Sequence, residues 1–144
     1  PRVDVPLEAL KAIDFAPFRA LNDLPMAMTA HLVFADCDPD RPATQSPQMI
    51  RLIREEIGFT GLLMSDDLNM QALQGTLAER TARTIAAGVD IALHCKGDMA
   101  EMEAVAAAAG AMTPAARTRA EAAIAARRPG VVDVAEALAE LAHG

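Results

Sequence analysis

The stretch of sequence that decides the fold is Leu52–Asn69, which reads LIREEIGFTGLLMSDDLN. Apolar residues at helical spacing lead up to Gly58, and glycine commonly ends a helix because it adopts left-handed backbone easily. After a second glycine, Gly61, a nearly continuous apolar run ends at Asp66 and Asp67. Such a run is typical of a strand in a parallel sheet that is covered on both faces. Carboxylates that follow the C-terminal end of such a strand lie where α/β folds place their functional sites.

Two further apolar runs of the same kind, residues 25–31 and 89–95, flank the run at 61–66. Helix signals alternate with these predicted strands. Residues 7–21 are expected to be helical, with an interruption at Pro17. Side-chain caps followed by proline or glutamate predict further helix starts at Ser46-Pro47, Thr76 with Glu79, Asp98 with Glu101, Thr113-Pro114 and Asp133 with Glu136. The order is therefore βαβαβα followed by Ala-rich helices, which places the chain in the α/β class.

The composition fits one globular domain and argues against several functions. The chain has 144 residues and a net charge of −7, and 52% of its residues are hydrophobic. The acidic balance argues against a nucleic-acid partner, and no apolar run approaches the roughly 20 residues of a membrane-spanning helix. With two cysteines and no secretory leader in view, we expect a reduced, cytoplasmic setting. Whether Pro1 follows a removed initiator methionine or a cut inside a longer protein stays open.

Asp66 and Asp67 are the candidate functional residues. Adjacent residues of a strand point to opposite faces of the sheet, so the two carboxylates cannot act as a catalytic pair on one substrate. We expect one to face a site and the other to cap the following segment or to orient a neighbour. The alternative is that both only solvate a loop and cap residues 68–73. The sequence contains no cluster at metal-ligand spacing and no glycine-rich phosphate loop.

Three predicted strands make a poor independent sheet for this much helix. A complete (β/α)8 barrel needs about 200 residues or more. The chain is therefore either a small open α/β domain or a piece of a larger barrel, and composition does not choose between them. The core must be built from aliphatic residues, since the sequence has four Phe and neither Trp nor Tyr. Most of the eight methionines, and Cys95, are expected to fill that core.

The stretch 52–69 resembles the active-site signature of glycoside hydrolase family 3. That signature has two aliphatic residues, a basic residue, a charged residue after one free position, then a glycine with three aliphatics, and Ser or Thr before the nucleophilic Asp. Here the nucleophile position falls on Asp66 and the closing polar position on Asn69. The surroundings are similar to the bacterial β-N-acetylhexosaminidase branch of the family over about residues 6–97, with matching stretches at 28–31, 38–44, 65–70 and 87–90.

The resemblance implies a fold and a reaction. Residues 1–144 would be the last three βα units of a (β/α)8 TIM barrel with C-terminal Ala-rich helices, an incomplete barrel domain. Asp66 would attack the anomeric carbon and form a covalent glycosyl-enzyme, so that hydrolysis retains the configuration. Met70 and His31 would line the sugar subsite, although a structural hydrogen-bonding role for His31 is an equal alternative. Asp67 would support the site from behind, and no cofactor or metal is implied.

The general acid/base of such an enzyme is missing from this sequence. In the branch that the chain resembles, that role belongs to a His–Asp pair on a loop after a Lys-His-Phe-Pro-Gly segment, which this chain lacks. We therefore expect the chain alone to be inactive. His94 is expected at the pocket rim or packed beneath it, and His143 in solvent. Lys96 stands where the family commonly has Asn, so a sugar contact at that position is not carried over.

The resemblance also implies partners. The expected substrate is terminal β-linked N-acetylglucosamine on a muropeptide or a chitooligosaccharide, with no nucleic acid or membrane involved. The expected macromolecular partner is the missing N-terminal part of the barrel or a second copy, because a partial barrel exposes two sheet edges. Two alternatives stay open. One is a non-catalytic α/β module that binds a sugar or a protein, and the other is an unrelated flavodoxin-like domain.

Overall fold

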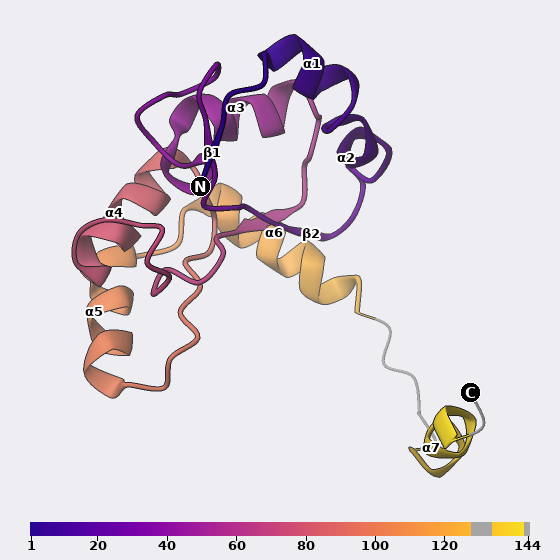
Figure 1. The fold of residues 1–144 in the computed structure, drawn as a ribbon. Coiled ribbons are helices and arrows are strands. Elements are labelled where there is room, and N and C mark those ends of the chain that lie inside the picture. The colour runs from indigo at the N-terminus through magenta and orange to yellow at the C-terminus, as the bar shows by residue number, and fades with distance from the viewer. Residues whose placement is uncertain (128–133, 143–144) are drawn as a thin grey trace.

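The computed structural model describes residues 1–127 and 134–142, and Figure 1 shows the course of the chain. Helices and short strands alternate as β1 (Arg2–Val3), α1 (Leu7–Ala12), α2 (Ala16–Ala20), β2 (Met26–Met28), β3 (Val33–Phe34), the 3-10 helix η1 (Ala43–Gln45), α3 (Pro47–Glu55), β4 (Leu62–Met64) and α4 (Leu77–Ala87). Further helices are α5 (Met99–Ala109), α6 (Pro114–Ala125) and α7 (Val134–Ala142). Among the residues described, no helix is long and apolar enough to cross a membrane.

The first two predicted strands form and lie side by side. β2 and β4 pair in parallel, with Met26 opposite Leu62 and Met28 opposite Met64. The chain crosses from one strand to the other through η1 and α3. A parallel pair needs such a crossover, because a tight turn can only join antiparallel strands. This is the βαβ unit that the sequence predicts.

The prediction of a regular strand over residues 89–95 is wrong. In this segment only Ile91 pairs, in a parallel bridge with Met64. A side chain replaces part of the ladder, since the Leu63 N–H donates to Asp90 Oδ2 at 3.0 Å. The segment still runs beside β4, because the Asp90 N–H donates to the Leu63 carbonyl oxygen at 2.9 Å. The sequence does not predict the second parallel pair, β1 with β3, because strands of two residues carry no periodic pattern.

The predicted helix starts are confirmed where the chain is described. Cap side chains accept a backbone N–H from three residues further on, at 3.0–3.1 Å, at Ser46, Asp98 and Thr113. Thr76 and Glu79 form the reciprocal capping box at the start of α4. The predicted interruption at Pro17 is also present, since this proline lies in the first turn of α2. The predicted cap at Asp133 and the side chain of His143 lie outside the described residues.

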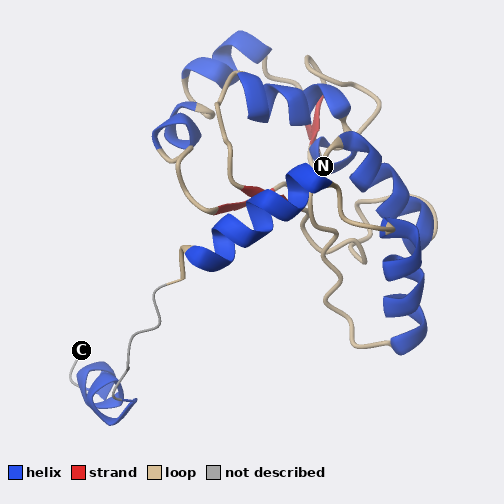
Figure 2. Cartoon of the chain, turned by 180° about the vertical axis from the view of Figure 1, so that it is seen from behind, coloured by secondary structure: helices blue, strands red, loops and turns tan. Residues whose placement is uncertain are grey.

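Two apolar clusters hold these elements together. The first joins α1 and α3 and consists of Leu10, Phe15, Ala43, Met49, Leu52 and Ile57. The second packs β4 against α3 and α4 and consists of Ile50, Phe59, Leu63, Ala87 and Val89. Helix α6 contacts β4 and crosses in front of the strands in Figure 2. One face of the β2–β4 pair is therefore covered by helices of its own βα units.

The expectation that most of the methionines fill the core is wrong. Six of the eight are exposed, namely Met26, Met28, Met70, Met99, Met102 and Met112. For β2 the reason is strand alternation, because Ala27 packs on the second cluster and its two neighbours point to the opposite face. Those two neighbours, Met26 and Met28, are 43% and 52% exposed. The chain thus leaves an apolar strand face in solvent.

Candidate active site

Asp66 follows the C-terminal end of β4 and is half-buried. Its Oδ1 accepts the Asp67 N–H at 2.8 Å, which fixes one carboxylate oxygen. The other oxygen, Oδ2, has no hydrogen-bond partner among the residues described. A carboxylate with one anchored and one free oxygen keeps a defined orientation and still has lone pairs to offer a ligand. The position at the end of a parallel strand is where α/β folds assemble functional sites.

Asp67 ties two loops together. Its Oδ1 accepts the N–H of Asn69 at 3.0 Å and the N–H of Cys95 at 3.2 Å. The first bond closes the turn after β4, and the second joins this turn to the loop that follows residues 89–94. Its own N–H holds Asp66. The two carboxylates therefore make different contacts, although both lie beyond the end of β4 and strand alternation does not apply to them.

His31 is buried behind these aspartates, with 4% of its surface exposed. Its Nε2 lies 3.0 Å from the Asp67 carbonyl oxygen, so Nε2 carries the proton and donates. Its Nδ1 lies 2.8 Å from Thr44 Oγ1 and can accept that hydroxyl proton, for which the Ala30 carbonyl oxygen at 3.0 Å competes. Thr29 Oγ1 adds a further hydroxyl 2.8 Å from Thr44 Oγ1. His31 thus has the structural hydrogen-bonding role that the sequence left open.

Met70 lies on the same loop and is 43% exposed. Arg80 of α4 holds this loop, because its Nη1 donates to the carbonyl oxygens of Leu68 at 2.9 Å and Met70 at 3.1 Å. Its Nε donates to the Gly75 carbonyl oxygen at 2.9 Å. Sequence reasoning missed Arg80. The available signal was an arginine in the first turns of the helix that follows the candidate loop.

A buried ion-pair network lies at the opposite end of β4. The Asp90 side chain is 4% exposed and pairs with Arg54 Nη2 at 2.7 Å and Arg119 Nη1 at 2.8 Å. Arg54 Nη1 also donates to the carbonyl oxygens of Phe59 and Gly61, at 3.1 and 2.8 Å. Burial lowers the pKa of Arg54, and the paired Asp90 carboxylate opposes that shift. The basic position of the 52–69 signature is thus structural and fixes the start of the strand that ends at the site.

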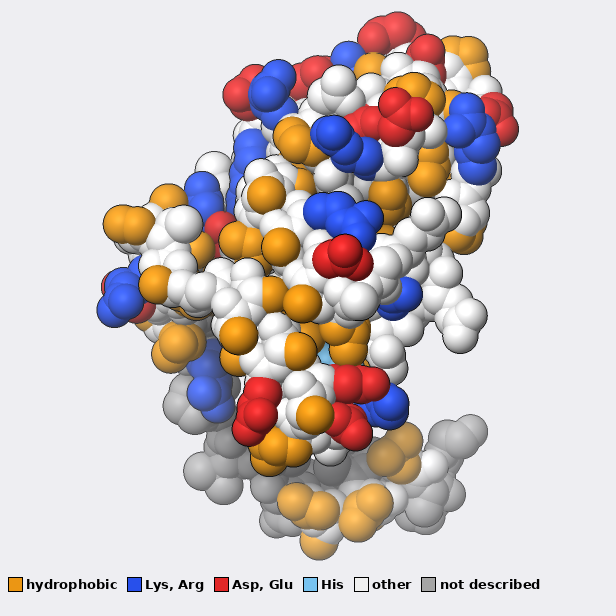
Figure 3. All heavy atoms as spheres, turned by 90° about the vertical axis from the view of Figure 1, so that its left-hand side faces the viewer, with side chains coloured by type: hydrophobic (Ala, Val, Ile, Leu, Met, Phe, Trp, Pro, Cys, Tyr) orange, Lys and Arg blue, Asp and Glu red, His pale blue; other side chains and the backbone are white. Residues whose placement is uncertain are grey.

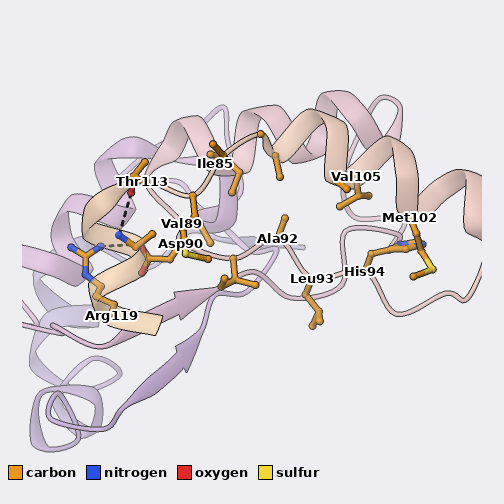
Figure 4. A pocket seen from close by; sticks show the side chains of 18 residues that line it. Ile85, Val89, Asp90, Ala92, Leu93, His94, Met102, Val105, Thr113 and Arg119 are labelled. Carbon is orange, nitrogen blue, oxygen red and sulfur yellow. Dashed lines mark hydrogen bonds and ion pairs between the residues drawn. The ribbon is translucent and has the colours of Figure 1, made fainter. Parts of the chain in front are cut away.

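The His94 side chain is 5% exposed. It lines a cavity of about 620 Å³, together with Met102 of α5 and the residues of the open edge at 89–93. Figure 4 shows His94 beside Met102 at one end of this cavity and Arg119 with Asp90 at the other. Asp66 is not among the lining residues. The expectation that Cys95 is buried is wrong, since the turn away from the strand leaves its thiol exposed.

Metal binding finds no support in the described part of the chain, where no group of three or more His, Cys, Asp or Glu side chains could hold an ion. Asp67 Oδ1 accepts two backbone N–H groups, and both oxygen atoms of Asp90 are used by a backbone N–H group and arginines. Lys96 pairs with Glu101 Oε1 at 2.9 Å. In the described part of the chain, Asp66 therefore follows β4 with Oδ1 anchored and Oδ2 without a hydrogen-bond partner.

Solved structures with a similar fold include glycosidases. The chain is similar to a glycoside hydrolase family 3 beta-N-acetylglucosaminidase from Paenibacillus sp., with a TM-score of 0.74 and 25% identity over 93% of this chain and 29% of that one. It is also similar to NagZ from Neisseria gonorrhoeae in complex with N-trifluoroacetyl-D-glucosamine, with a TM-score of 0.73 and 30% identity over 85% of this chain and 37% of that one. Fold and site together define part of a TIM-barrel-type α/β domain of a glycoside hydrolase.

The family follows from the sequence match. The family described as Glycosyl hydrolase family 3 N terminal domain matches residues 1–128, so the chain belongs to glycoside hydrolase family 3. Within that family it is of the NagZ type. Relatives named Beta-hexosaminidase from Neisseria gonorrhoeae, Pasteurella multocida and Bordetella pertussis are 37%, 34% and 31% identical over 93, 96 and 100 residues.

These matches span only part of each relative. They cover 62%, 62% and 67% of this chain but 26%, 27% and 28% of the three relatives. Most of the length of those proteins therefore has no counterpart in the 144 residues of this chain.

Proposed function

We propose that this chain is the nucleophile-bearing part of a retaining β-N-acetylhexosaminidase, made of the last three βα units of a TIM barrel. The observation that carries the proposal is Asp66, with Oδ1 held by the Asp67 N–H at 2.8 Å and Oδ2 free at the end of β4. A carboxylate is ionised at neutral pH and stabilises the positive charge that develops on the sugar ring. Family membership supports the same role for this position.

In the proposed reaction Asp66 attacks the anomeric carbon, and the bond from that carbon to the leaving oxygen breaks. A covalent glycosyl-Asp intermediate forms, and water then attacks it from the opposite side, so that the configuration is retained. Both steps need a proton donor and acceptor on the leaving-group side. Asp67 is not proposed for this role, because its Oδ1 accepts the Asn69 and Cys95 N–H groups and it lies next to the proposed nucleophile in the chain. We expect the acid/base to come from a part of the enzyme that this chain does not contain.

The proposed substrate is terminal β-linked N-acetylglucosamine, on a muropeptide or a chitooligosaccharide. The similar proteins are named beta-N-acetylglucosaminidase and Beta-hexosaminidase, which supports this class. Met70, exposed on the loop that carries Asp66, is proposed to touch the sugar. His31 is proposed to act on the substrate only through Asp67, because both ring nitrogens are engaged. A cytoplasmic setting is part of the proposal and agrees with the free thiols of Cys37 and Cys95.

The proposed site is incomplete in this chain. One sheet edge lies at the 89–94 segment, where neither the N–H nor the carbonyl of Ala92 pairs with another backbone group in the part described. The other lies at β2, beside an apolar cavity of about 350 Å³ whose lining includes Phe18, Leu24 and Met26. Unpaired edges recruit strands. We expect the remaining barrel units to pair at these edges, and the chain alone to be inactive.

The test is a chimera in which residues 1–128 replace the corresponding segment of Neisseria gonorrhoeae NagZ. Release of p-nitrophenol from its β-N-acetylglucosaminide is expected from the chimera. Asp66→Asn is expected to lower kcat at least about 1,000-fold, because it removes the nucleophile. Glu103→Gln on exposed α5 surface is the matched control. A folded chimera that is active and insensitive to Asp66→Asn contradicts the proposal.

The chain alone provides a second readout. A verified monomer of the 144 residues is expected to show no turnover, and measured hydrolysis by it would disprove the expected inactivity. Isothermal titration calorimetry with N-acetylglucosamine tests the alternative that the chain is a non-catalytic sugar-binding module. Binding by the chain, together with a chimera that shows no turnover and an Asp66→Asn variant changed only in affinity, would favour a sugar-binding module.

A further inference from the structure

His94 is a buried histidine placed between two carboxylates of different elements. Its Nδ1 lies 4.0 Å from Asp67 Oδ1, and its Nε2 lies 3.4 Å from Glu101 Oε2 on α5. The two ring nitrogens of His94 and Glu101 Oε2 are buried. None of these three atoms has a hydrogen bond among the residues described. Buried polar atoms are rarely left unpaired, so this group calls for an explanation.

The two ring nitrogens of His94 face different carboxylates, Nδ1 facing Asp67 Oδ1 and Nε2 facing Glu101 Oε2. Both distances, 4.0 and 3.4 Å, exceed the usual length of an N–H···O hydrogen bond, so the ring lies between the two carboxylates without a hydrogen bond to either.

We infer that His94 is a positioning residue for the nucleophile, and this inference rests on the proposed function of Asp66. The connection runs through Asp67. His94 Nδ1 faces the Asp67 carboxylate at 4.0 Å, and that carboxylate accepts the Asn69 N–H, which closes the turn. The Asp67 N–H then donates to Asp66 Oδ1 at 2.8 Å. His31 donates to the Asp67 carbonyl oxygen and His94 lies 4.0 Å from the Asp67 carboxylate, so two histidines from neighbouring segments flank Asp67.

The charges around His94 fit this role. Glu101 is itself anchored, because its Oε1 accepts from Lys96 Nζ at 2.9 Å, so Oε2 is left for the ring. The adjoining loop carries the ionisable residues Cys95, Lys96 and Asp98, and the segments after β4 and β2 carry Asp66, Asp67 and His31. Figure 3 shows acidic side chains with a basic one gathered at the lower end of that face, over the start of α5. The ring therefore links α5 to the nucleophile turn.

The test uses NMR on the full 144-residue chain and needs no hydrolysis. Glu101→Gln is expected to move the His94 Nε2 resonance by several parts per million and to shift the amide signals of Asp67 and Cys95. Glu103→Gln, an exposed glutamate of the same helix, is expected to leave all of them in place. His94→Phe, which keeps an aromatic ring and removes both nitrogens, is expected to shift the same amides.

The chimera gives the catalytic readout. His94→Phe is expected to lower kcat about 10-fold or more with little change in KM, because orientation of the nucleophile acts on the chemical step. His94→Gln, which keeps one N–H donor, is expected to recover part of the loss. Unmoved Asp67 and Cys95 amides in Glu101→Gln, or an unchanged kcat in a folded His94→Phe chimera, overturns the inference. An active Asp66→Asn chimera would instead overturn the proposed function. The NMR test does not depend on that result, because it measures the surroundings of Asp67 and Cys95 and not hydrolysis.

Discussion

The imidazole Nε2 of His31 donates to the backbone carbonyl oxygen of Asp67 across 3.0 Å. This bond joins the loop after β2 to the turn after β4, 36 positions further along the chain. Because the Asp67 N–H in turn holds the Asp66 carboxylate, the histidine is connected to the proposed nucleophile through the backbone. The residue next to the proposed nucleophile is thereby fixed by the loop that follows a neighbouring strand.

Removing that histidine should destabilise the chain. His31→Phe is expected to lower the free energy of unfolding by about 1–3 kcal/mol, because the Asp67 carbonyl oxygen and the buried Thr44 hydroxyl lose a partner. Urea unfolding followed by circular dichroism measures the change. Gln71→Ala changes an exposed residue of the loop after β4 and should leave the free energy of unfolding nearly unchanged. Equal stability of His31→Phe and Gln71→Ala would show that the His31–Asp67 hydrogen bond does not stabilise the fold.

The Asp90 network predicts a larger effect. Asp90→Asn should cost about 3–5 kcal/mol, because the positive charges of Arg54 and Arg119 then lose a carboxylate that is 4% exposed. Asp4→Asn removes the partner of Arg2 in an ion pair whose side chains are 51% and 70% exposed, and should cost less than about 1 kcal/mol. Denaturant unfolding of both variants compares them directly. Similar losses in the two would contradict a structural role for the buried network.

The glycines of the 52–69 signature and of the later loop make a matched pair. A Cβ on Gly61 would meet the carbonyl oxygens of Leu24 and Pro25 at 2.5 and 2.8 Å, so Gly61→Ala must displace backbone. We expect a loss of about 1–3 kcal/mol in the free energy of unfolding. A Cβ on Gly97 would meet nothing within 4 Å, so Gly97→Ala should stay within about 0.5 kcal/mol of the wild type. Thermal unfolding that ranks Gly97→Ala as the worse variant would refute this packing.

The capping box of α4 predicts a pH dependence. Hydrogen bonds from the N–H and hydroxyl of Thr76 lower the pKa of Glu79 below its ordinary 4.5. Since the folded-state pKa is the lower one, the carboxylate stabilises the fold above the unfolded pKa, and this contribution is lost as the pH falls through the folded value. The stability difference between wild type and Glu79→Gln should therefore be present at neutral pH and vanish in acid. A stability difference that grows on acidification would contradict the lowered pKa of Glu79 in the folded state.

The helix ends show how far local sequence reaches. Ser46, Thr76, Asp98 and Thr113 cap helices as predicted, because a cap needs only its own side chain and a backbone N–H three residues on. β2 and β4 could be predicted for a similar reason, since their apolar runs record burial in a parallel sheet. The strand over residues 89–95 could not, because its regularity depends on neighbours and the Asp90 side chain replaces a ladder bond.

The candidate site divides in the same way. The sequence by itself determined Asp66 as the candidate nucleophile and the family, because the spacing of the 52–69 signature is a property of consecutive residues. Only the tertiary structure decided that His31 and Arg80 hydrogen-bond to the 66–70 turn and that His94 lies beside it, each from a distant position in the sequence. It also decided which methionines are exposed. Such contacts follow from where the parallel crossovers place whole segments, and hydrophobic patterning along the chain does not record which side chains then meet.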